Sequence, residues 1–126
     1  RLVPPVLSTM DRVRVATFVD GGEACRRADI VVSNGGNPQL VQALAAGTPV
    51  LGLPSNYDQA LNSAHAGWTG AARSIHPARA SKERVRRFAS ELMGASAYKE
   101  AAVREAGRIA AIDVEERVRG AFAALV

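Results

Sequence analysis

The sequence has 126 residues, 48% of them hydrophobic and 22% charged, which is enough for one modest domain with its own core. No apolar run approaches the length that crosses a membrane, and nothing near the start resembles a signal peptide. The formal net charge is +4, but aromatic residues make up 5% of the chain. Bases and rings therefore do not interleave as they do where nucleotides stack, which argues against nucleic-acid binding.

Cysteine and histidine are too sparse for a disulfide framework or a metal site. Cys25 is the single cysteine, so no intrachain disulfide can form and a reducing, cytoplasmic location is expected. His65 and His76 lie far from Cys25 in sequence and show no metal-ligand spacing. The first residue is Arg1 and not Met, which fits a piece of a longer protein.

The first two-thirds of the chain alternates short apolar runs with short helical patterns, which is typical of parallel β-α units. We expect strands at residues 13–18, 30–32, 50–53 and, more weakly, 70–75. The run 30–32 has no polar alternation, so it is expected to be covered on both faces. Residues 1–12 show no strand, glycine turn and helix, so the opening β-α unit of a doubly wound domain is expected to be absent.

Two helices are expected before residue 50. A short one spans residues 23–27. The next opens with Asn37 as its cap and Pro38 at its first position, and Gly47 closes it. Its apolar side is expected to hold three residues: Leu40, Val41 and Leu44.

A third helix begins near Tyr57 in this prediction, with Leu61 and Ala64 facing inward and Gly67 as its stop. Residues 1–78 then form a β-α core, and residues 79–126 a helical tail that is expected to pack on the sheet.

Two stretches of the tail repeat apolar residues at helical spacing. They are Val85, Phe88, Ala89, Leu92 and Met93, and then Val114, Val118, Phe122 and Leu125. Five basic residues also cluster there: Arg79, Lys82, Arg84, Arg86 and Arg87. We interpret these bases as a solvated helix face, with a weak contact to an anionic membrane surface or a partner domain as the alternative.

Three loops that follow expected strands carry glycine or polar residues, at 18–20, 34–37 and 55–59. Because parallel strands end at one edge of a sheet, these loops should converge on a single ligand site. Gly35 and Gly36 allow close approach of a ligand, and the following helix presents free N–H groups that suit a phosphate. A tight structural turn explains the two glycines equally well.

The third loop offers Asp58 and Gln59 side by side at the start of a helix. Together they supply acceptors and an amide donor, which are the groups that would bind vicinal sugar hydroxyls. Asp58 alone is more commonly explained by a favourable interaction with the helix dipole.

The order and spacing of these segments resemble the donor-binding signature of GT-B-fold glycosyltransferases, most closely the UDP-glycosyltransferases and their antibiotic- and macrolide-modifying bacterial relatives. That signature reads roughly His-Gly-Gly-x-Gly-Thr, then Glu-Ala-Leu-x-x-Gly-x-Pro, then Asp-Gln-x-x-Asn. The matching segments here are 28–36, 42–50 and 58–62, with Pro54 between the last two. The resemblance covers about residues 11–76.

The resemblance implies an α/β fold: a Rossmann-like parallel sheet with flanking helices and a C-terminal helical tail, the C-terminal domain of a GT-B enzyme without its first β-α unit. It also implies roles for ten residues. The donor diphosphate would be bound by Asn34, Gly35, Gly36, Asn37 and Gln39; the ribose by Gln42; the transferred sugar by Asp58 and Gln59; and the nucleobase would be flanked by Phe18 and Val19.

Four positions depart from the family pattern: Asn34, Pro38, Gln39 and Gln42. Replacing the usual ribose-binding carboxylate by the Gln42 amide exchanges a charge-assisted hydrogen bond for a neutral one, a loss of about 1 kcal/mol. Such a loss is about fivefold in affinity and retunes donor binding without abolishing it.

The implied function is transfer of a sugar from a UDP- or dTDP-sugar to a small hydroxylated acceptor with inversion, without a cofactor or metal. The general base would lie in an N-terminal acceptor-binding domain, so this chain would hold no catalytic residue and would be inactive alone. The alternatives are an epimerase or hydrolase of related architecture, and a binding module whose site has degenerated. Neither a nucleic acid nor a membrane span is expected, and homo-oligomer formation stays open.

Overall fold

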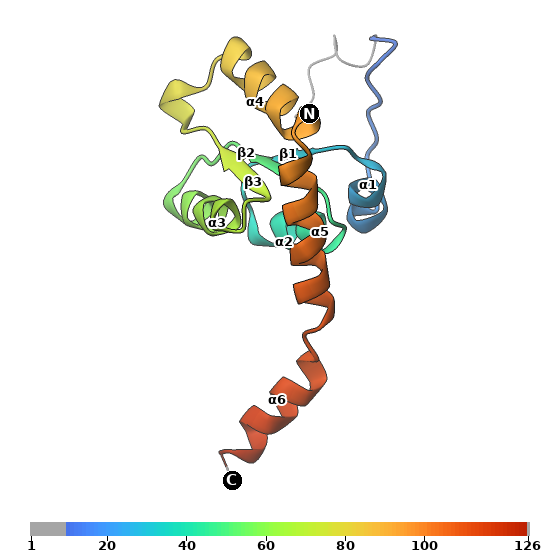
Figure 1. The fold of residues 1–126 in the computed structure, drawn as a ribbon, viewed down its shortest axis with the longest axis vertical. Coiled ribbons are helices and arrows are strands. Elements are labelled where there is room, and N and C mark those ends of the chain that lie inside the picture. The colour runs from blue at the N-terminus through green and yellow to red at the C-terminus, as the bar shows by residue number, and fades with distance from the viewer. Residues whose placement is uncertain (1–9, 126) are drawn as a thin grey trace.

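The computed structural model describes residues 10–125 and contains a three-stranded parallel sheet with helices on both faces (Figure 1). The strands, in spatial order, are β1 (Val31–Ser33), β2 (Val50–Gly52) and β3 (Ala72–Ser74). Helix α2 (Asn37–Ala45) joins β1 to β2, and helix α3 (Tyr57–Trp68) joins β2 to β3. The predicted parallel α/β core is confirmed, with strands close to 30–32, 50–53 and 70–75.

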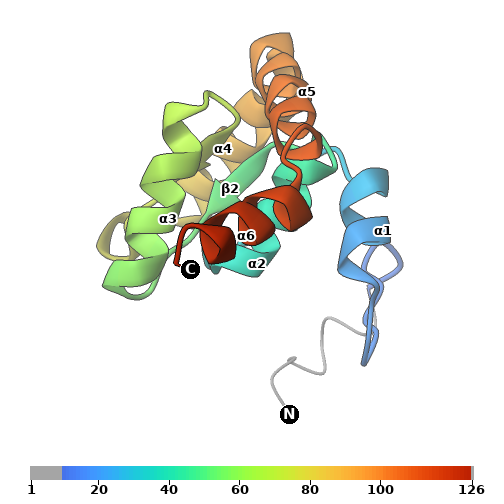
Figure 2. The same cartoon turned by 90° about the horizontal axis from the view of Figure 1, so that it is seen from below.

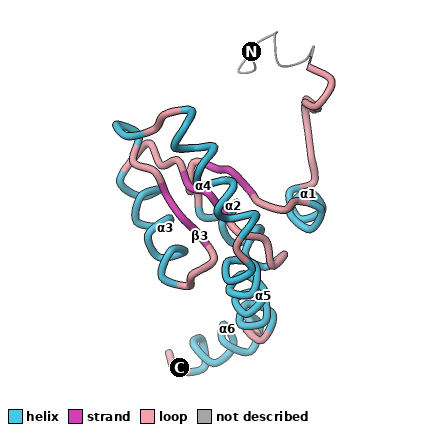
Figure 3. The backbone as a smooth tube through the Cα atoms, turned by 45° about the horizontal axis from the view of Figure 1, so that its top comes forward, coloured by secondary structure: helices cyan, strands magenta, loops and turns pink. Residues whose placement is uncertain are grey.

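The central strand β2 contributes to two separate cores. Val50 and Leu51 are fully buried and point to opposite faces of the sheet. Val50 packs with α1 (Gly21–Arg27), α2, α3 and α5 (Ser96–Ala110), largely through alanine and leucine side chains. Leu51 packs with Ile75 and with α4 (Lys82–Gly94) on the other face. Figure 3 shows the strands, in magenta, with helices on either side.

The strand expected at residues 13–18 is wrong. Within residues 10–20 the structure has a turn followed by irregular chain that is exposed apart from half-buried Val13; Phe18 is 84% and Val19 57% exposed. The Val13 amide bonds to the Met10 carbonyl at 2.9 Å, and no backbone hydrogen bond joins this segment to β1 in the described residues. Apolar, β-branched residues favour a strand only where a neighbour accepts their backbone groups, and β1 pairs with β2 alone here.

The absent opening β-α unit was a prediction about residues 1–12. Residues 1–9 lie outside the described residues, and residues 10–12 contain a turn. The prediction that β1 is covered on both faces is wrong at Val32, which is 49% exposed. Its face of the sheet is covered by α4, which packs against β2 and β3 but does not extend over the edge strand.

Both connecting helices are rotated relative to their predicted inward faces. In α2, Leu40 and Leu44 are buried as expected, but Val41 is 45% exposed and Ala43 is buried instead. In α3, the predicted inward residues are exposed, at Leu61 and Ala64, and the buried ones are Ser63 and Ala66. Small side chains let α3 lie close to β3, so size and not hydrophobicity selects the inward face.

The ends of these helices also differ in part from the prediction. Gly47 follows α2 with φ +67, the left-handed conformation expected of a glycine stop. Helix α3 continues past Gly67 to Trp68, and the left-handed residue after it is Gly70, with φ +80. Gly67 has ordinary helical geometry, so it is tolerated inside the helix and does not end it.

The tail forms three helices with different surroundings. A short 3-10 turn, η2 (Pro77–Arg79), leads into α4, whose Phe88 and Leu92 pack on the sheet as predicted. Helix α5 packs mainly on α2, and Lys99 donates from its ammonium to the Gly47 carbonyl at 2.7 Å. The basic residues near η2 and α4 are exposed apart from half-buried Arg84.

The last helix, α6 (Val114–Ala123), projects away from the body of the molecule in Figure 1, and in the view from below in Figure 2 it lies in front of α2. Its apolar residues are exposed: Val114 65%, Val118 49%, Phe122 67% and, just beyond the helix, Leu125 83%. The prediction that the whole tail packs on the sheet is therefore wrong for α6. Among the described residues, no helix is both long and apolar enough to cross a membrane.

Candidate functional site

The loop after β1 is a tight turn closed by its own side chains. The Gly35 amide donates to the Ser33 hydroxyl at 3.1 Å, and the Gly36 amide donates to the Asn34 side-chain oxygen at 3.0 Å. Helix α2 starts at Asn37 with Gly36 as its cap residue and no side-chain cap. Asn37 was expected to be the cap, but the Asn34 turn moves that position one residue earlier.

Gly35 is held in place by close packing beneath the turn. Its φ is +84, and an added β-carbon would lie 2.3 Å from the Ser63 hydroxyl and 2.7 Å from the Gln59 carbonyl oxygen. The same hydroxyl would lie 2.7 Å from a β-carbon at Gly52. Contact between the loop after β1 and the first turns of α3 therefore depends on glycine at these two positions.

Ser63 was not predicted as a site residue, although it lies under the turn at residues 33–36, called the glycine turn below. It is 3% exposed, and its hydroxyl oxygen has no hydrogen-bond partner among residues 10–125. A buried, unpaired hydroxyl costs free energy. Only its unusual place on the inward face of an otherwise alanine-rich helix could have drawn attention to it in the sequence.

The loop after β2 begins α3 with side-chain hydrogen bonds. The Asn56 side chain caps the helix by accepting from the Gln59 amide at 2.9 Å. The Gln59 side-chain oxygen accepts from the Ser55 amide at 2.8 Å and the Ser55 hydroxyl at 2.9 Å. Asp58 is exposed and accepts from the Asn62 side chain at 3.2 Å. These bonds order the predicted sugar-binding pair at the start of the helix.

A cavity of about 330 Å³, the α1 cavity, lies between α1, β1 and α2. Three predicted site residues line it: Val19, Gln39 and Gln42. The other lining residues are small or apolar for the most part: Gly21, Ala24, Cys25, Ala28, Val31, Val32 and Ser33. Because Ser33 both lines the cavity and accepts from Gly35, the cavity and the glycine turn are parts of one surface.

Gln42 lies against the first residue of α1. A β-carbon at Gly21 would sit 2.3 Å from the Gln42 side-chain oxygen, so glycine is what admits this side chain. Asp20 caps α1 by accepting from the Glu23 amide at 2.7 Å. Gly21, the first residue of α1, therefore forms part of the wall of the cavity.

Other predicted site residues do not meet in this cavity. Phe18 is 84% exposed and is not among the residues that line it. Asn37 lines a different cavity of about 200 Å³, between α2, α3 and α5. Gln59 approaches Gly35 through its backbone carbonyl, and Asp58 is the residue before it on α3. Of the three loops that were expected to converge, those at residues 34–37 and 55–59 lie against each other. The loop at residues 18–20 reaches the α1 cavity through Val19.

Cys25 is the one titratable group in the α1 cavity with a displaced pKa. Burial raises the pKa of its thiol above the ordinary 9.0, and the neighbouring Arg26 partly offsets that effect. Within residues 10–125 no group of three or more histidine, cysteine or acidic side chains is arranged to hold a metal ion. No lysine, arginine, aspartate or glutamate is among the lining residues of the α1 cavity, so it is largely uncharged.

The raised pKa of Cys25 predicts a loss of stability at alkaline pH. The folded chain holds the thiol proton more tightly than the unfolded chain, so this contribution is fully present below pH 9 and disappears as the pH rises through the folded-state pKa. The free energy of unfolding, measured in urea between pH 7 and pH 10.5, should fall more steeply for the natural chain than for Cys25→Ala. Parallel curves for the two proteins would contradict this assignment.

Comparison with known proteins finds relatives of this chain in sequence and in structure. No protein-family model matches the sequence. A PGL/p-HBAD biosynthesis glycosyltransferase from Mycobacterium tuberculosis is 39% identical over 90 residues, which is 71% of this chain and 21% of that protein. This chain therefore spans about a fifth of the length of that curated relative.

Two solved structures share the fold. The glycosyltransferase VinC, in complex with dTDP, superposes with a TM-score of 0.78 over 87% of this chain and 29% of that one, at 24% identity. The spinosyn forosaminyltransferase SpnP gives 0.79 over 88% and 31%, at 22% identity. The sequence likeness and the shared fold point to the same enzymes. The chain is thus similar, in sequence and in fold, to one part of GT-B-fold glycosyltransferases, a group that includes antibiotic glycosyltransferases and UDP-glycosyltransferases.

Proposed function

We propose that this chain is the donor-binding part of a glycosyltransferase that moves a sugar from a nucleoside diphosphate to a small hydroxylated acceptor. The observation that carries the proposal is the α1 cavity, which brings Val19, Gln39 and Gln42 together and is joined to the glycine turn through Ser33. A site for a nucleotide needs an apolar slot for a ring next to backbone donors for phosphate, and this surface offers both.

The parts of the donor are assigned by the chemistry of each segment. The pyrimidine ring enters the apolar α1 cavity beside Val19, the neighbour in sequence of exposed Phe18. Gln42 hydrogen-bonds the ribose, and the diphosphate lies at the start of α2 near Gln39. The sugar reaches Asp58 and Gln59 at the start of α3. The dTDP bound to VinC supports a thymidine nucleotide as one candidate, and UDP is the other.

Phosphate binding requires a change of partners in the glycine turn. The Gly35 and Gly36 amides are occupied by the Ser33 hydroxyl and the Asn34 side chain in this structure. A phosphate oxygen has to replace these acceptors, and it does so as a charged acceptor that forms the stronger hydrogen bond. Because existing hydrogen bonds must break first, the exchange lowers the net free energy gained on binding, and the chain alone should bind the nucleotide weakly.

The proposed reaction is a direct displacement with inversion. An acceptor hydroxyl oxygen attacks the anomeric carbon, the bond from that carbon to the diphosphate oxygen breaks, and its electron pair leaves with the nucleoside diphosphate. The acceptor proton passes to a base that we place in another domain. The N-terminus of α2 stabilises the negative charge that develops on the leaving group. This chain then supplies donor binding and leaving-group stabilisation, and it should not turn over alone.

Calorimetric titration with UDP and dTDP tests the proposal, both on this chain and on a longer protein that carries it. We expect saturable binding of one nucleotide in the micromolar to millimolar range. No heat from either nucleotide at millimolar concentration, in either protein, would refute donor binding and favour a degenerate module. Turnover of a nucleotide sugar without any acceptor would favour an epimerase or hydrolase.

The substitution Gln42→Glu should strengthen nucleotide binding. A carboxylate accepts a ribose hydroxyl more strongly than an amide by about 1 kcal/mol, which is about fivefold in affinity. The matched control is Gln39→Glu, one turn away on α2 and also in the cavity wall. Placed near the diphosphate, the same new charge should weaken binding. Equal effects of the two substitutions, measured by titration with the nucleotide that binds, would contradict the assigned ribose contact.

A further inference from the structure

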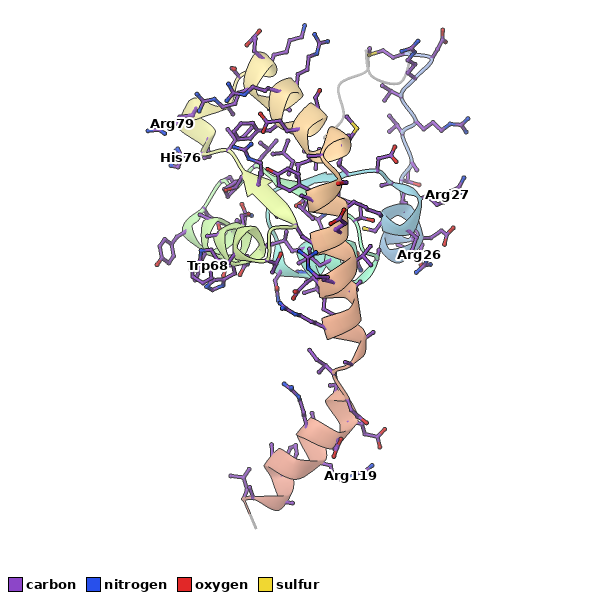
Figure 4. All side chains as sticks on the ribbon, viewed as in Figure 1. Arg26, Arg27, Trp68, His76, Arg79 and Arg119 are labelled. Carbon is purple, nitrogen blue, oxygen red and sulfur yellow. The ribbon has the colours of Figure 1, made fainter. Side chains whose placement is uncertain are left out.

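A second pocket, the η2 pocket, lies at the same edge of the sheet as the glycine turn. It is formed where the chain leaves β2 and β3, between the start of α3 and η2, and its volume is about 540 Å³. Pro54, Tyr57 and Ala60 line one side, and His76, Pro77 and Ala78 the other. Figure 4 shows His76 beside η2, on the same side of the molecule as α3. The roles proposed above use none of these residues.

The lining of the η2 pocket suits an uncharged ring. No lysine, arginine, aspartate or glutamate is among its eight lining residues, which also include Ser55 and Asn56. Proline and alanine supply flat, rigid apolar walls, and Tyr57 adds an aromatic ring that is 83% exposed. Pockets of about 300–1,000 Å³ with apolar walls and few polar groups are the ones that enclose ring-sized ligands.

His76 provides a hydrogen-bond donor in this pocket. Its Nδ1 accepts from the Ala78 amide at 3.3 Å, so the proton of the neutral ring is on Nε2. Nε2–H can then donate to a ligand oxygen. In this tautomer the imidazole cannot also take a proton at Nε2, so its role is to position the ligand and not to act as a base.

The order of the strands places the η2 pocket beyond the sugar. The α1 cavity adjoins β1, the glycine turn follows β1, the Asp58–Gln59 pair follows β2, and the η2 pocket extends from β2 to the end of β3. A donor laid along this edge in the proposed orientation has its sugar next to this pocket. What meets the sugar on its far side in a transfer reaction is the acceptor.

We propose that the η2 pocket binds the ring of the acceptor: a neutral, ring-bearing alcohol or phenol whose oxygen accepts from His76. This assignment of the pocket to the acceptor rests on the proposed donor function. Binding of a ring to the pocket can nevertheless be tested without any nucleotide. It makes this chain contribute to acceptor choice as well as to donor binding.

Phenol is a suitable probe, and the two histidines of the chain provide an internal control. Titration with phenol, followed by NMR of the imidazole carbon-bound protons, should shift the His76 signals saturably and leave His65 unchanged. His65 lies on α3 in the wall of the cavity between α2 and α3, outside the η2 pocket. Benzoate, which has the same ring with a charge, should bind at least about tenfold more weakly, since no charged side chain lines the pocket.

A matched pair of substitutions on α3 locates the binding site. Ala60 and Ala64 are both exposed and one turn apart, but only Ala60 lines the η2 pocket. Ala60→Leu should fill the pocket and weaken phenol binding about tenfold or more, while Ala64→Leu should change it less than about twofold. Both proteins are checked for folding by their unfolding midpoints in urea.

Four outcomes would overturn the acceptor assignment. His76 signals that do not respond to phenol would show that the pocket does not bind a ring. Equal shifts at both histidines, or equal effects of the two leucine substitutions, would show nonspecific binding. A response to methyl glucoside and not to phenol would make the pocket a second sugar site. Nucleotide titration of the same samples reports separately on the donor function, so failure of one proposal is distinguishable from failure of the other.

Discussion

Replacing Gly35 by alanine is expected to lower the free energy of unfolding by about 2–5 kcal/mol. Its φ of +84 is a conformation that costs a residue with a β-carbon about 1 kcal/mol or more. The new methyl group would also lie 2.3 Å from the Ser63 hydroxyl and 2.7 Å from the Gln59 carbonyl oxygen. Overpacking of this kind typically adds about 1–3 kcal/mol, because the Gln59 carbonyl is part of the backbone and the Ser63 side chain is buried, so neither moves freely.

Gly36→Ala is the matched control for this substitution. Gly36 has φ −62, which any residue adopts, and the nearest atom to an added β-carbon is the Asn34 side-chain oxygen at 3.3 Å. Its cost should stay below about 1 kcal/mol, as for a mild change at a helix cap. Urea denaturation of the two variants measures the difference. Similar losses in both would show that the left-handed turn does not constrain the loop.

The effect of Gly35→Ala on nucleotide binding separates structure from function. Under the proposed function the glycine turn binds the diphosphate. The substitution should therefore also abolish binding of UDP or dTDP under conditions in which the variant is still folded. Adding Ser63→Ala removes one of the two close contacts and should restore part of the stability. The contact with the Gln59 carbonyl would persist, so recovery should be incomplete.

The glycine turn was predictable because its signals are local. Two adjacent glycines before a helix, after a β-branched run, restrict the backbone to a few conformations, and the order of β-α units then places the turn at the edge of the sheet. The same reasoning located the start of α3 correctly, since Asn56 and Asp58 favour a helix N-terminus.

Features that depend on neighbours were not predictable in the same way. The run at residues 13–18 has the composition of a strand, but strand formation needs a partner that local sequence does not reveal. The inward face of α3 was assigned to Leu61, whereas close packing on β3 selects Ser63 and Ala66. Hydrophobicity alone favours the larger side chain, and only the short distance between helix and strand reverses the choice.

The candidate site shows the same division. Gln39 and Gln42 share a face of α2, so helical spacing predicts that they meet in one cavity, and they do. Asn37 lies in the first turn of the same helix, yet it faces α3. The η2 pocket could not be anticipated, because its two walls come from loops more than fifteen residues apart whose approach depends on the pairing of β2 with β3.

Leu92→Ala is expected to lower the free energy of unfolding by about 2–5 kcal/mol, the usual range for removing a buried leucine side chain. Leu92 is 2% exposed and packs with Leu51, Ile75 and Phe88 on the face of the sheet that α4 covers. The loss would show that α4 is part of the folding unit formed by the β-α core. Alanine is a good helix former, so the effect would come from lost packing and not from helix propensity.

Two exposed residues, one on α4 and one on α6, provide controls in which the side chain is removed without loss of buried packing. Met93, the next residue on α4, is 55% exposed, so Met93→Ala should change the free energy of unfolding by less than about 0.5 kcal/mol. Phe122→Ala, on the projecting helix α6, should be equally mild because Phe122 is 67% exposed. Urea denaturation of all three variants gives the comparison. A loss at Phe122 as large as that at Leu92 would mean that α6 packs on the body in solution, because only a buried aromatic side chain contributes that much.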